Sequence, residues 1–313
     1  MNVNELRLAV VGVGHLGRHH ARLLATMPGV RLVGVVDTNV ARAQEIAAGA
    51  NTTPFTEWRD LLGAVDAVTI AVPTEAHLEV ALGFIAAGVH VLVEKPLARS
   101  VAEADQMIAA AAARGVQLAV GHTERFNPAV TAARGLLSHP RFIEVHRLGT
   151  FPERSLDIDV VFDLMIHDLD LLLAIVGEPV VSVEAVGVPV LTPRIDIANV
   201  RLKFAGGCIA NLTASRISRD RVRKIRFFQP QSYLSIDYAA QEVEHWTLGP
   251  GPTGGPAILG GKLDVAKDEP LRCELDDFVN AVRERRPARV TGEQGRAALD
   301  LAATIVERMD HVR

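Results

Sequence analysis

The sequence predicts an α/β protein of two domains. The first is a parallel sheet covered by helices on both faces, and the second is an α+β domain with a large, mainly antiparallel open sheet. The chain has 313 residues, which is long for a single hydrophobic core. Short valine-rich runs alternate with amphipathic stretches up to residue 122, and beyond it several long strand patterns follow one another without helices between them. We therefore expect domains at 1–122 and 123–313.

Five valine-rich runs in the first domain predict buried strands, at 6–11, 30–37, 64–72, 89–95 and 116–122. The stretches between them have helical spacing, near 15–27, 39–48, 75–87 and 101–114. Ser100 and Glu103 form a capping box at the start of the last helix. Strands and helices repeated in this order indicate βαβ units, which build a parallel sheet.

The second domain mixes a few helices with many strands. Helices are expected near 128–138 and 159–176, on either side of a strand at 142–150. Further strands are expected at 180–191, 198–205, 208–218, 223–229 and 232–240. A segment rich in glycine and proline at 249–262 predicts a mobile or ligand-covering loop. Two helices near 270–285 and 293–311 close the chain, and they are free to pack back on the first domain.

Composition narrows the class of protein. The formal net charge of −4 disfavours nucleic acid as a partner. A basic run at 216–226 falls between two strands and predicts a solvated hairpin or an oligomer contact. Cys208 and Cys273 are too few for a disulfide framework or a CxxC metal site, which indicates a reducing compartment. No secretion signal or membrane-spanning run is visible, so we expect a cytoplasmic protein.

The first strand ends in a glycine-rich turn with the spacing GxGxxG, formed by Gly12, Gly14 and Gly17. A helix follows the turn, and Asp37 ends the second strand twenty residues after Gly17, where a carboxylate binds the ribose hydroxyls of a dinucleotide. This combination predicts a Rossmann domain that prefers NAD to NADP, with His15 and Leu16 in the phosphate-binding turn. We expect no metal site, because no third ligand accompanies the histidines of this turn.

An apolar stretch at 159–176 carries a polar stripe, in which Asp163, His167 and Asp170 share one helical face. The stripe must face either solvent or a site that uses it, because an unpaired buried carboxylate is costly. A histidine with a pKa near neutrality suits the removal of a hydroxyl proton. For Asp170 and Asp168 we expect structural roles.

Other polar residues lie at predicted strand ends, where open α/β sheets bind ligands. Pro73, Thr74, Glu94 and Lys95 are expected near the cofactor. For His77 a ligand contact and a cap or surface role stay open. A second group follows the strand at 116–122, and we expect substrate or nicotinamide contacts from His122, Arg125 and Asn127, with interdomain packing as the alternative.

Taken with Gly12–Gly17 and Asp37, three further motifs carry a resemblance: AVPTEAH at 71–77, EKP at 94–96 and DLMIH at 163–167. With them the chain resembles the family of glucose–fructose oxidoreductase, inositol dehydrogenase and MocA over essentially its whole length. The segments GHTERFNPAV (121–130), DVVFDLMIHDLDLL (159–172) and NLTASRISRDRVRKIRFFQP (211–230) resemble more closely the UDP-N-acetylglucosamine 3-dehydrogenases, which feed amino-sugar synthesis for lipid A.

The resemblance implies an NAD-dependent dehydrogenase that oxidises a secondary hydroxyl of a nucleotide sugar, at C3 of UDP-N-acetylglucosamine. It implies that Lys95 and His167 flank the reacting carbon, that Asp163 holds the imidazole or the substrate, and that all three contact the substrate. It also implies a homodimer or homotetramer formed through the open sheet. A different sugar or polyol dehydrogenase and a non-catalytic NAD sensor stay open as alternatives.

Overall fold

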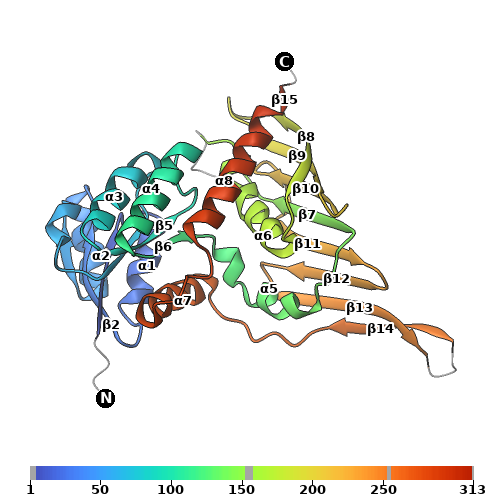
Figure 1. Cartoon of the computed structure of the whole chain (residues 1–313), viewed down its shortest axis with the longest axis horizontal. Helices are drawn as coiled ribbons and strands as arrows, with labels where there is room; N and C mark the ends of the chain where they lie inside the picture. The colour runs from blue at the N-terminus through green and yellow to red at the C-terminus, as the bar shows by residue number, and fades with distance from the viewer. Residues whose placement is uncertain (1–4, 152–157, 252–254, 312–313) are drawn as a thin grey trace. The chain divides into compact units, whose positions relative to one another are not determined.

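The computed structural model describes residues 5–151, 158–251 and 255–311, and Figure 1 shows the chain as a ribbon. Two compact units are present. The first consists of Met1–Thr123 and Leu271–Leu299, and the second of Glu124–Pro270 and Asp300–Arg313. Each unit is organised around one sheet, parallel in the first and mainly antiparallel in the second. The two sheets confirm the predicted fold class.

The sheet of the first unit has six parallel strands in the order β3-β2-β1-β4-β5-β6. They are β1 (Leu6–Val11), β2 (Val30–Val36), β3 (Thr53–Phe55), β4 (Ala67–Ile70), β5 (His90–Glu94) and β6 (Leu118–Gly121). The strand order reverses between β1 and β4. Open α/β sheets bind ligands beyond the carboxyl ends of the strands at such a point.

Helices connect these strands and cover the sheet (Figure 1). They are α1 (Gly17–Leu24), α2 (Val40–Ala50), α3 (His77–Ala86) and α4 (Val101–Arg114), with short 3-10 helices η1 (Trp58–Leu61) and η2 (Thr74–Ala76). Ser100 caps α4 as predicted, since its Oγ accepts from the Glu103 amide at 3.2 Å. The Glu103 carboxylate, however, accepts from the Arg99 amide and not from that of Ser100.

One core joins this sheet to a helix from the end of the chain. α7 (Pro270–Glu284) places Leu275, Phe278 and Val279 in the same buried cluster as Leu8 and Val10 of β1. α8 (Gly292–Glu307) begins in the first unit and ends in the second. The apolar stripe of α7 therefore belongs to the core of the parallel-sheet unit, although more than a hundred residues of the second unit precede it in the sequence.

The sheet of the second unit has nine strands in the order β14-β13-β12-β11-β7-β10-β9-β8-β15. They are β7 (Phe142–Leu148), β8 (Val180–Val188), β9 (Ile197–Phe204), β10 (Ile209–Ser215), β11 (Val222–Gln229), β12 (Ser232–Asp237), β13 (Glu242–Pro250), β14 (Pro256–Lys262) and β15 (Asp310–His311). Among the described strands of this sheet, only the pairs β7–β10 and β8–β15 are parallel. In β9, buried Val200 and Leu202 alternate with exposed Arg201 and Lys203, so one face of this strand is covered and the other is open.

The helices of the second unit begin with η3 (Thr123–Phe126), α5 (Pro128–Ala133) and η4 (Arg134–Leu136). The stretch with the polar stripe then starts as a π-helical turn, η5 (Val161–Met165), and continues as α6 (Ile166–Val176). α5 contacts β12 and β13, and η5 contacts β10. A π-turn inside a helix is frequent at functional sites because it alters which side chains share a face.

Two differences between the structure and the predicted elements stand out. β3 was not predicted, because three residues are too few to show a period. The prediction of a glycine- and proline-rich loop at 249–262 is wrong for most of that range. Gly249 and Pro250 end β13, and Pro256–Lys262 form β14. Residues 252–254 lie outside the described part. Proline and glycine are tolerated in β14 because it lies at the sheet edge.

Candidate functional site

The glycine turn after β1 has the local geometry that its spacing predicts. Gly12 has a φ of +84°, and a Cβ on it would come within 2.7 Å of the Ala71 backbone after β4. A Cβ on Gly17 would meet the Gly12 carbonyl oxygen at 1.8 Å. Both positions therefore exclude side chains. A Cβ on Gly14 would meet nothing within 4 Å, which leaves open space beside the backbone where α1 begins.

Asp37 lies beside this turn at the end of β2. Its Oδ2 accepts from the Val13 amide at 3.2 Å, and its Oδ1 accepts from the Asn39 amide at 2.9 Å. Arg42, in the first turn of α2, approaches the same carboxylate with its Nη1 3.5 Å from Oδ2. The glycine turn, the open side of Gly14 and this carboxylate fit a dinucleotide of the NAD type. We did not predict Arg42, although its place one helical turn beyond the Asn39 cap is visible in the sequence.

Residues after β4 and β5 form a second group at the carboxyl end of the same sheet. Pro73 is exposed and Thr74 is half-buried. Lys95 is half-buried too, and the peptide bond between Lys95 and Pro96 is cis. His77 is 1% exposed, which excludes a surface role for it. Its ring nitrogens lie within hydrogen-bonding distance of backbone carbonyl oxygens from both strand ends.

A buried histidine–carboxylate pair lies next to Lys95. His20 of α1 places its Nε2 3.0 Å from Oε1 of Glu94, and neither side chain is more than 8% exposed. Oε2 of Glu94 accepts from the Lys95 amide at 3.2 Å. Burial acts to raise the pKa of Glu94, but His20 and Lys95 outweigh it and the pKa is lowered. His20 was not among the predicted site residues, and its 74-residue separation from Glu94 leaves no local signal of the pair.

In the second unit, the polar stripe is divided between two environments. Asp163 in η5 and His167 in α6 are half-buried. Asp170 is buried, and its Oδ2 accepts from Nε of Arg125 at 2.9 Å. Asp168 is also buried and accepts two bonds from Arg147, at 2.6 and 2.9 Å. The two aspartates thus take the structural roles that we expected.

Two of the predicted substrate contacts are already engaged inside the second unit. Arg125 is 7% exposed and bonded to Asp170. Asn127 caps α5, accepting from the Ala129 amide at 3.0 Å, while its Nδ2 donates to the Tyr238 carbonyl at 3.0 Å. His122, in the first unit, is 1% exposed. Contacts of these residues with a substrate stay predictions.

A third buried arginine–aspartate pair of the second unit holds the residues that lead into η5. Nε of Arg216 donates to Oδ1 of Asp196 at 2.8 Å, and Nη1 of Arg216 donates to the Ile158 carbonyl at 2.6 Å. The Ile195 amide donates to Asp159 at 2.9 Å, and the Ile195 carbonyl accepts from the Val160 amide at 3.0 Å. The pair therefore holds the residues that immediately precede η5.

The pair also corrects the interpretation of the basic run. Arg216 is 1% exposed, so the expectation of a solvated hairpin is wrong at that residue. The end of the run, from Val222, lies in β11.

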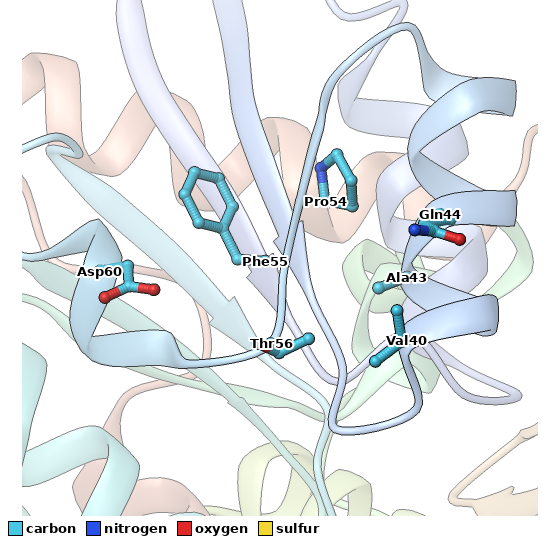
Figure 2. A pocket seen from close by; sticks show the side chains of 7 residues that line it. All are labelled: Val40, Ala43, Gln44, Pro54, Phe55, Thr56 and Asp60. Carbon is cyan, nitrogen blue, oxygen red and sulfur yellow. The ribbon is translucent and has the colours of Figure 1, made fainter.

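A hollow of about 270 Å³ lies on the β3 side of the parallel sheet (Figure 2). Its lining comes from α2, β3 and η1 and consists of Val40, Ala43, Gln44, Pro54, Phe55, Thr56 and Asp60. It contains none of the residues predicted for the site. Among the described residues, no group of three or more His, Cys, Asp or Glu side chains is arranged to hold a metal ion. No helix within the described ranges is long and apolar enough to cross a membrane.

Comparisons with known families match both halves of the chain. The profile described as an oxidoreductase family with an NAD-binding Rossmann fold matches residues 6–122. The profile of the GFO/IDH/MocA C-terminal domain matches residues 130–229.

Individual relatives match nearly the full length. UDP-N-acetylglucosamine 3-dehydrogenase from Acidithiobacillus ferrooxidans is 41% identical over 96% of both chains. A solved structure of that enzyme superposes with a TM-score of 0.91 and covers 97% of each chain. Myo-inositol 2-dehydrogenase from Thermotoga maritima is 26% identical over 98% of this chain and 97% of its own.

Proposed function

The chain belongs to the GFO/IDH/MocA oxidoreductase family, and from that premise we propose that it oxidises the C3 hydroxyl of UDP-N-acetylglucosamine to a ketone with NAD. The observation that carries the proposal is the 41% identity, over 96% of both chains, to an enzyme named for this reaction. The NAD-binding profile over residues 6–122 supports the cofactor. The glycine turn with Asp37 supports NAD over NADP, because a carboxylate there repels a 2′-phosphate.

Three residues are assigned to the chemistry. His167 takes the proton of the sugar hydroxyl, a role that suits a half-buried imidazole. Lys95 stabilises the charge that develops on the oxygen as the proton leaves. Asp163 orients the imidazole or holds a neighbouring sugar hydroxyl. NAD, when bound, accepts the hydride from the carbon that carries this hydroxyl.

The supporting residues divide by the ligand that they serve. Gly12, Gly14, His15, Leu16 and Gly17 are assigned to the pyrophosphate, at the start of α1. Pro73, Thr74 and Glu94 are assigned to the surroundings of the nicotinamide and Lys95. His122, Arg125 and Asn127 are assigned to the substrate side. The domain boundary is assigned to residues 122–123.

We place the enzyme in the cytoplasm, as a homodimer or homotetramer. The support for self-association is the open face and outer edge of the nine-stranded sheet. Trp246, Leu248 and Ile258 are exposed on the adjacent strands β13 and β14, to 37%, 53% and 75%. Large apolar side chains gathered on one sheet are characteristic of a surface that another copy covers.

One substrate panel tests the proposal. The protein is incubated with NAD and either UDP-N-acetylglucosamine, UDP-N-acetylgalactosamine, UDP-glucose or myo-inositol, and the ketone is drained by an amino donor and an aminotransferase. NADH should accumulate fastest with UDP-N-acetylglucosamine, and deuterium placed at its C3 should appear in the NADH. Preference for myo-inositol would favour the alternative of a polyol dehydrogenase, which the Thermotoga relative represents. Deuterium that stays on the sugar would exclude oxidation at C3.

A further inference from the structure

His77 lies between two strand ends of the parallel sheet and contacts the backbone of both. Its Nδ1 lies 3.0 Å from the Pro96 carbonyl oxygen and 3.3 Å from that of Leu97. Its Nε2 lies 3.0 Å from the Val72 carbonyl oxygen. The side chain is 1% exposed, so solvent supplies no alternative partner. The ring therefore bridges the segment after β4 and the segment after β5.

The bridge depends on the donor chemistry of the ring. Carbonyl oxygens only accept hydrogen bonds, so each contact requires an N–H on the facing nitrogen. A neutral imidazole has one N–H and an imidazolium has two. Burial lowers the pKa of His77, and the three carbonyls and the charge of Glu94 oppose the shift only in part. The neutral ring can donate to one segment at a time, and exchange between its two tautomers lets it hold each segment in turn.

The His77 bridge lies beside Lys95, so it can influence where Lys95 is placed. The ladder between β4 and β5 ends at the pair Ile70 and Val93. Beyond that pair one segment runs toward Pro73, and the other continues through Glu94, which still pairs with Gly121 of β6, and Lys95 into Pro96. His77 connects them where the ladder has ended. On the N-terminal side of Lys95, the Lys95 amide donates a hydrogen bond to the Glu94 carboxylate.

We propose that His77 is a positioning residue, which sets the place of Lys95 through the carbonyls of Pro96 and Leu97 and the place of the cofactor-facing segment through Val72. The inference rests on the proposed function in one respect, since it takes Lys95 as the group that stabilises developing charge. It refines the predicted role of His77, because a ring engaged with three backbone carbonyls acts on the cofactor indirectly.

Two amide variants separate the two anchors. In His77→Asn the side-chain nitrogen can occupy the place of Nδ1, which preserves the contact with Pro96 and Leu97. In His77→Gln it can occupy the place of Nε2, which preserves the contact with Val72. His77→Leu keeps the bulk and removes both contacts. Each variant is compared with the wild type for kcat, KM for NAD and melting temperature.

The proposal predicts that the two amide variants change different kinetic constants. His77→Gln should lower kcat by about tenfold or more while KM for NAD changes little, because small displacements of a catalytic group are costly. His77→Asn should keep most of kcat and raise KM for NAD. His77→Leu should show both defects. Equal losses in the Asn and Gln variants, or losses that only follow the melting temperature, would overturn the proposal, and so would wild-type constants in His77→Leu.

A second readout separates this inference from the proposed function. The rate at which a lysine-directed reagent modifies Lys95 is measured by mass spectrometry in the same variants, with Lys95→Met assayed for turnover in parallel. The Gln variant should change the modification rate and the Asn variant should not. If Lys95→Met turns over like the wild type, the role assigned to Lys95 is wrong, and the modification rates still decide whether His77 positions it. Identical modification rates in all variants would overturn the positioning role.

Discussion

The two units hold their candidate functional residues by different forces. In the parallel-sheet unit the backbone dominates: glycines permit close approach, Asp37 accepts from amides, and His77 reaches carbonyls. In the antiparallel-sheet unit, buried arginine–aspartate pairs surround the helix that carries Asp163 and His167. The pairs are Arg125–Asp170 at 2.9 Å, Arg147–Asp168 at 2.6 Å and Arg216–Asp196 at 2.8 Å.

This difference follows from where the side chains are mounted. The ends of adjacent parallel strands lie together at one sheet edge, so the sheet itself places the segments that follow them. A helix packed on an antiparallel sheet has no such ladder to fix its rotation and depth. Directional ion pairs supply the constraint, at the cost of removing charges from water. We therefore expect stability to depend on side-chain charges far more in the second unit than in the first.

The largest expected effect on the free energy of unfolding comes from removal of the Asp196 carboxylate, which binds several partners. Its Oδ2 accepts from the amides of Val190, Leu191 and Thr192 at 2.6–2.8 Å, in addition to the bond between Arg216 and Oδ1. Asp196→Ala should lower the free energy of unfolding by about 3–5 kcal/mol, because it leaves a buried guanidinium unpaired. Thermal and denaturant unfolding would measure the change.

A matched control comes from the other unit. Asp37 also accepts from backbone amides, but the side chain of its ionic partner Arg42 is 49% exposed, so removal of the carboxylate leaves no buried guanidinium. Asp37→Ala should therefore cost about 1 kcal/mol or less, in the range of ordinary hydrogen bonds. Equal losses in the two variants would remove the contrast between the units.

Two of the buried pairs should respond to pH in opposite directions. Burial acts to raise the pKa of Asp196, but the Thr192 amide and the Arg216 guanidinium outweigh it, so the pKa is lowered. Burial raises the pKa of Asp168, Arg147 offsets this only in part, and the charge of nearby Glu124 adds to the rise. The same kind of pair thus has a different proton affinity, according to whether backbone amides assist it.

The sign of each effect follows from proton linkage. A lowered folded-state pKa gives stability above the unfolded pKa of about 4, and that stability is lost as the pH falls. A raised folded-state pKa has the reverse effect. The contribution of Asp168 to the free energy of unfolding therefore rises as the pH falls toward the unfolded pKa of about 4. Lowering the pH from 7 to about 4 should therefore widen the stability difference between wild type and Asp168→Asn, whereas the difference for Asp196→Asn should shrink mainly as the pH falls below about 4. Parallel slopes for the two variants would contradict the assigned directions.

How much of this was visible in the sequence depended on the range of each interaction. The glycine turn and Asp37 were predictable because their spacing is a local sequence motif, and each strand end was predictable from the residues of its own strand. The pairs His20–Glu94 and Arg147–Asp168 were not, because they join elements 74 and 21 residues apart that only the fold brings together. The β13–β14 hairpin was missed for a different reason. Its glycines and prolines are the usual marks of a loop, whereas an edge strand tolerates them.

The smallest expected effect concerns cofactor choice, where the first unit should respond in ligand preference instead of stability. Arg42 lies 3.5 Å from Asp37 and is held at the start of α2, where its amide donates to the Asn39 cap at 3.0 Å. Asp37→Ser removes the carboxylate that repels a 2′-phosphate and leaves the Arg42 guanidinium without that partner. Binding of NADP relative to NAD should improve by about tenfold, which corresponds to about 1.4 kcal/mol.

The double variant Asp37→Ser/Arg42→Ala is the matched control. It lacks both the repelling carboxylate and the guanidinium, so it should lose most of the gain if Arg42 binds the phosphate. Fluorescence titration of NAD and NADP with the wild type and both variants measures the ratio directly. A gain of the same size in the double variant would assign the preference to charge repulsion by Asp37 alone. A wild type that binds NADP as tightly as NAD would show that Asp37 does not read the ribose.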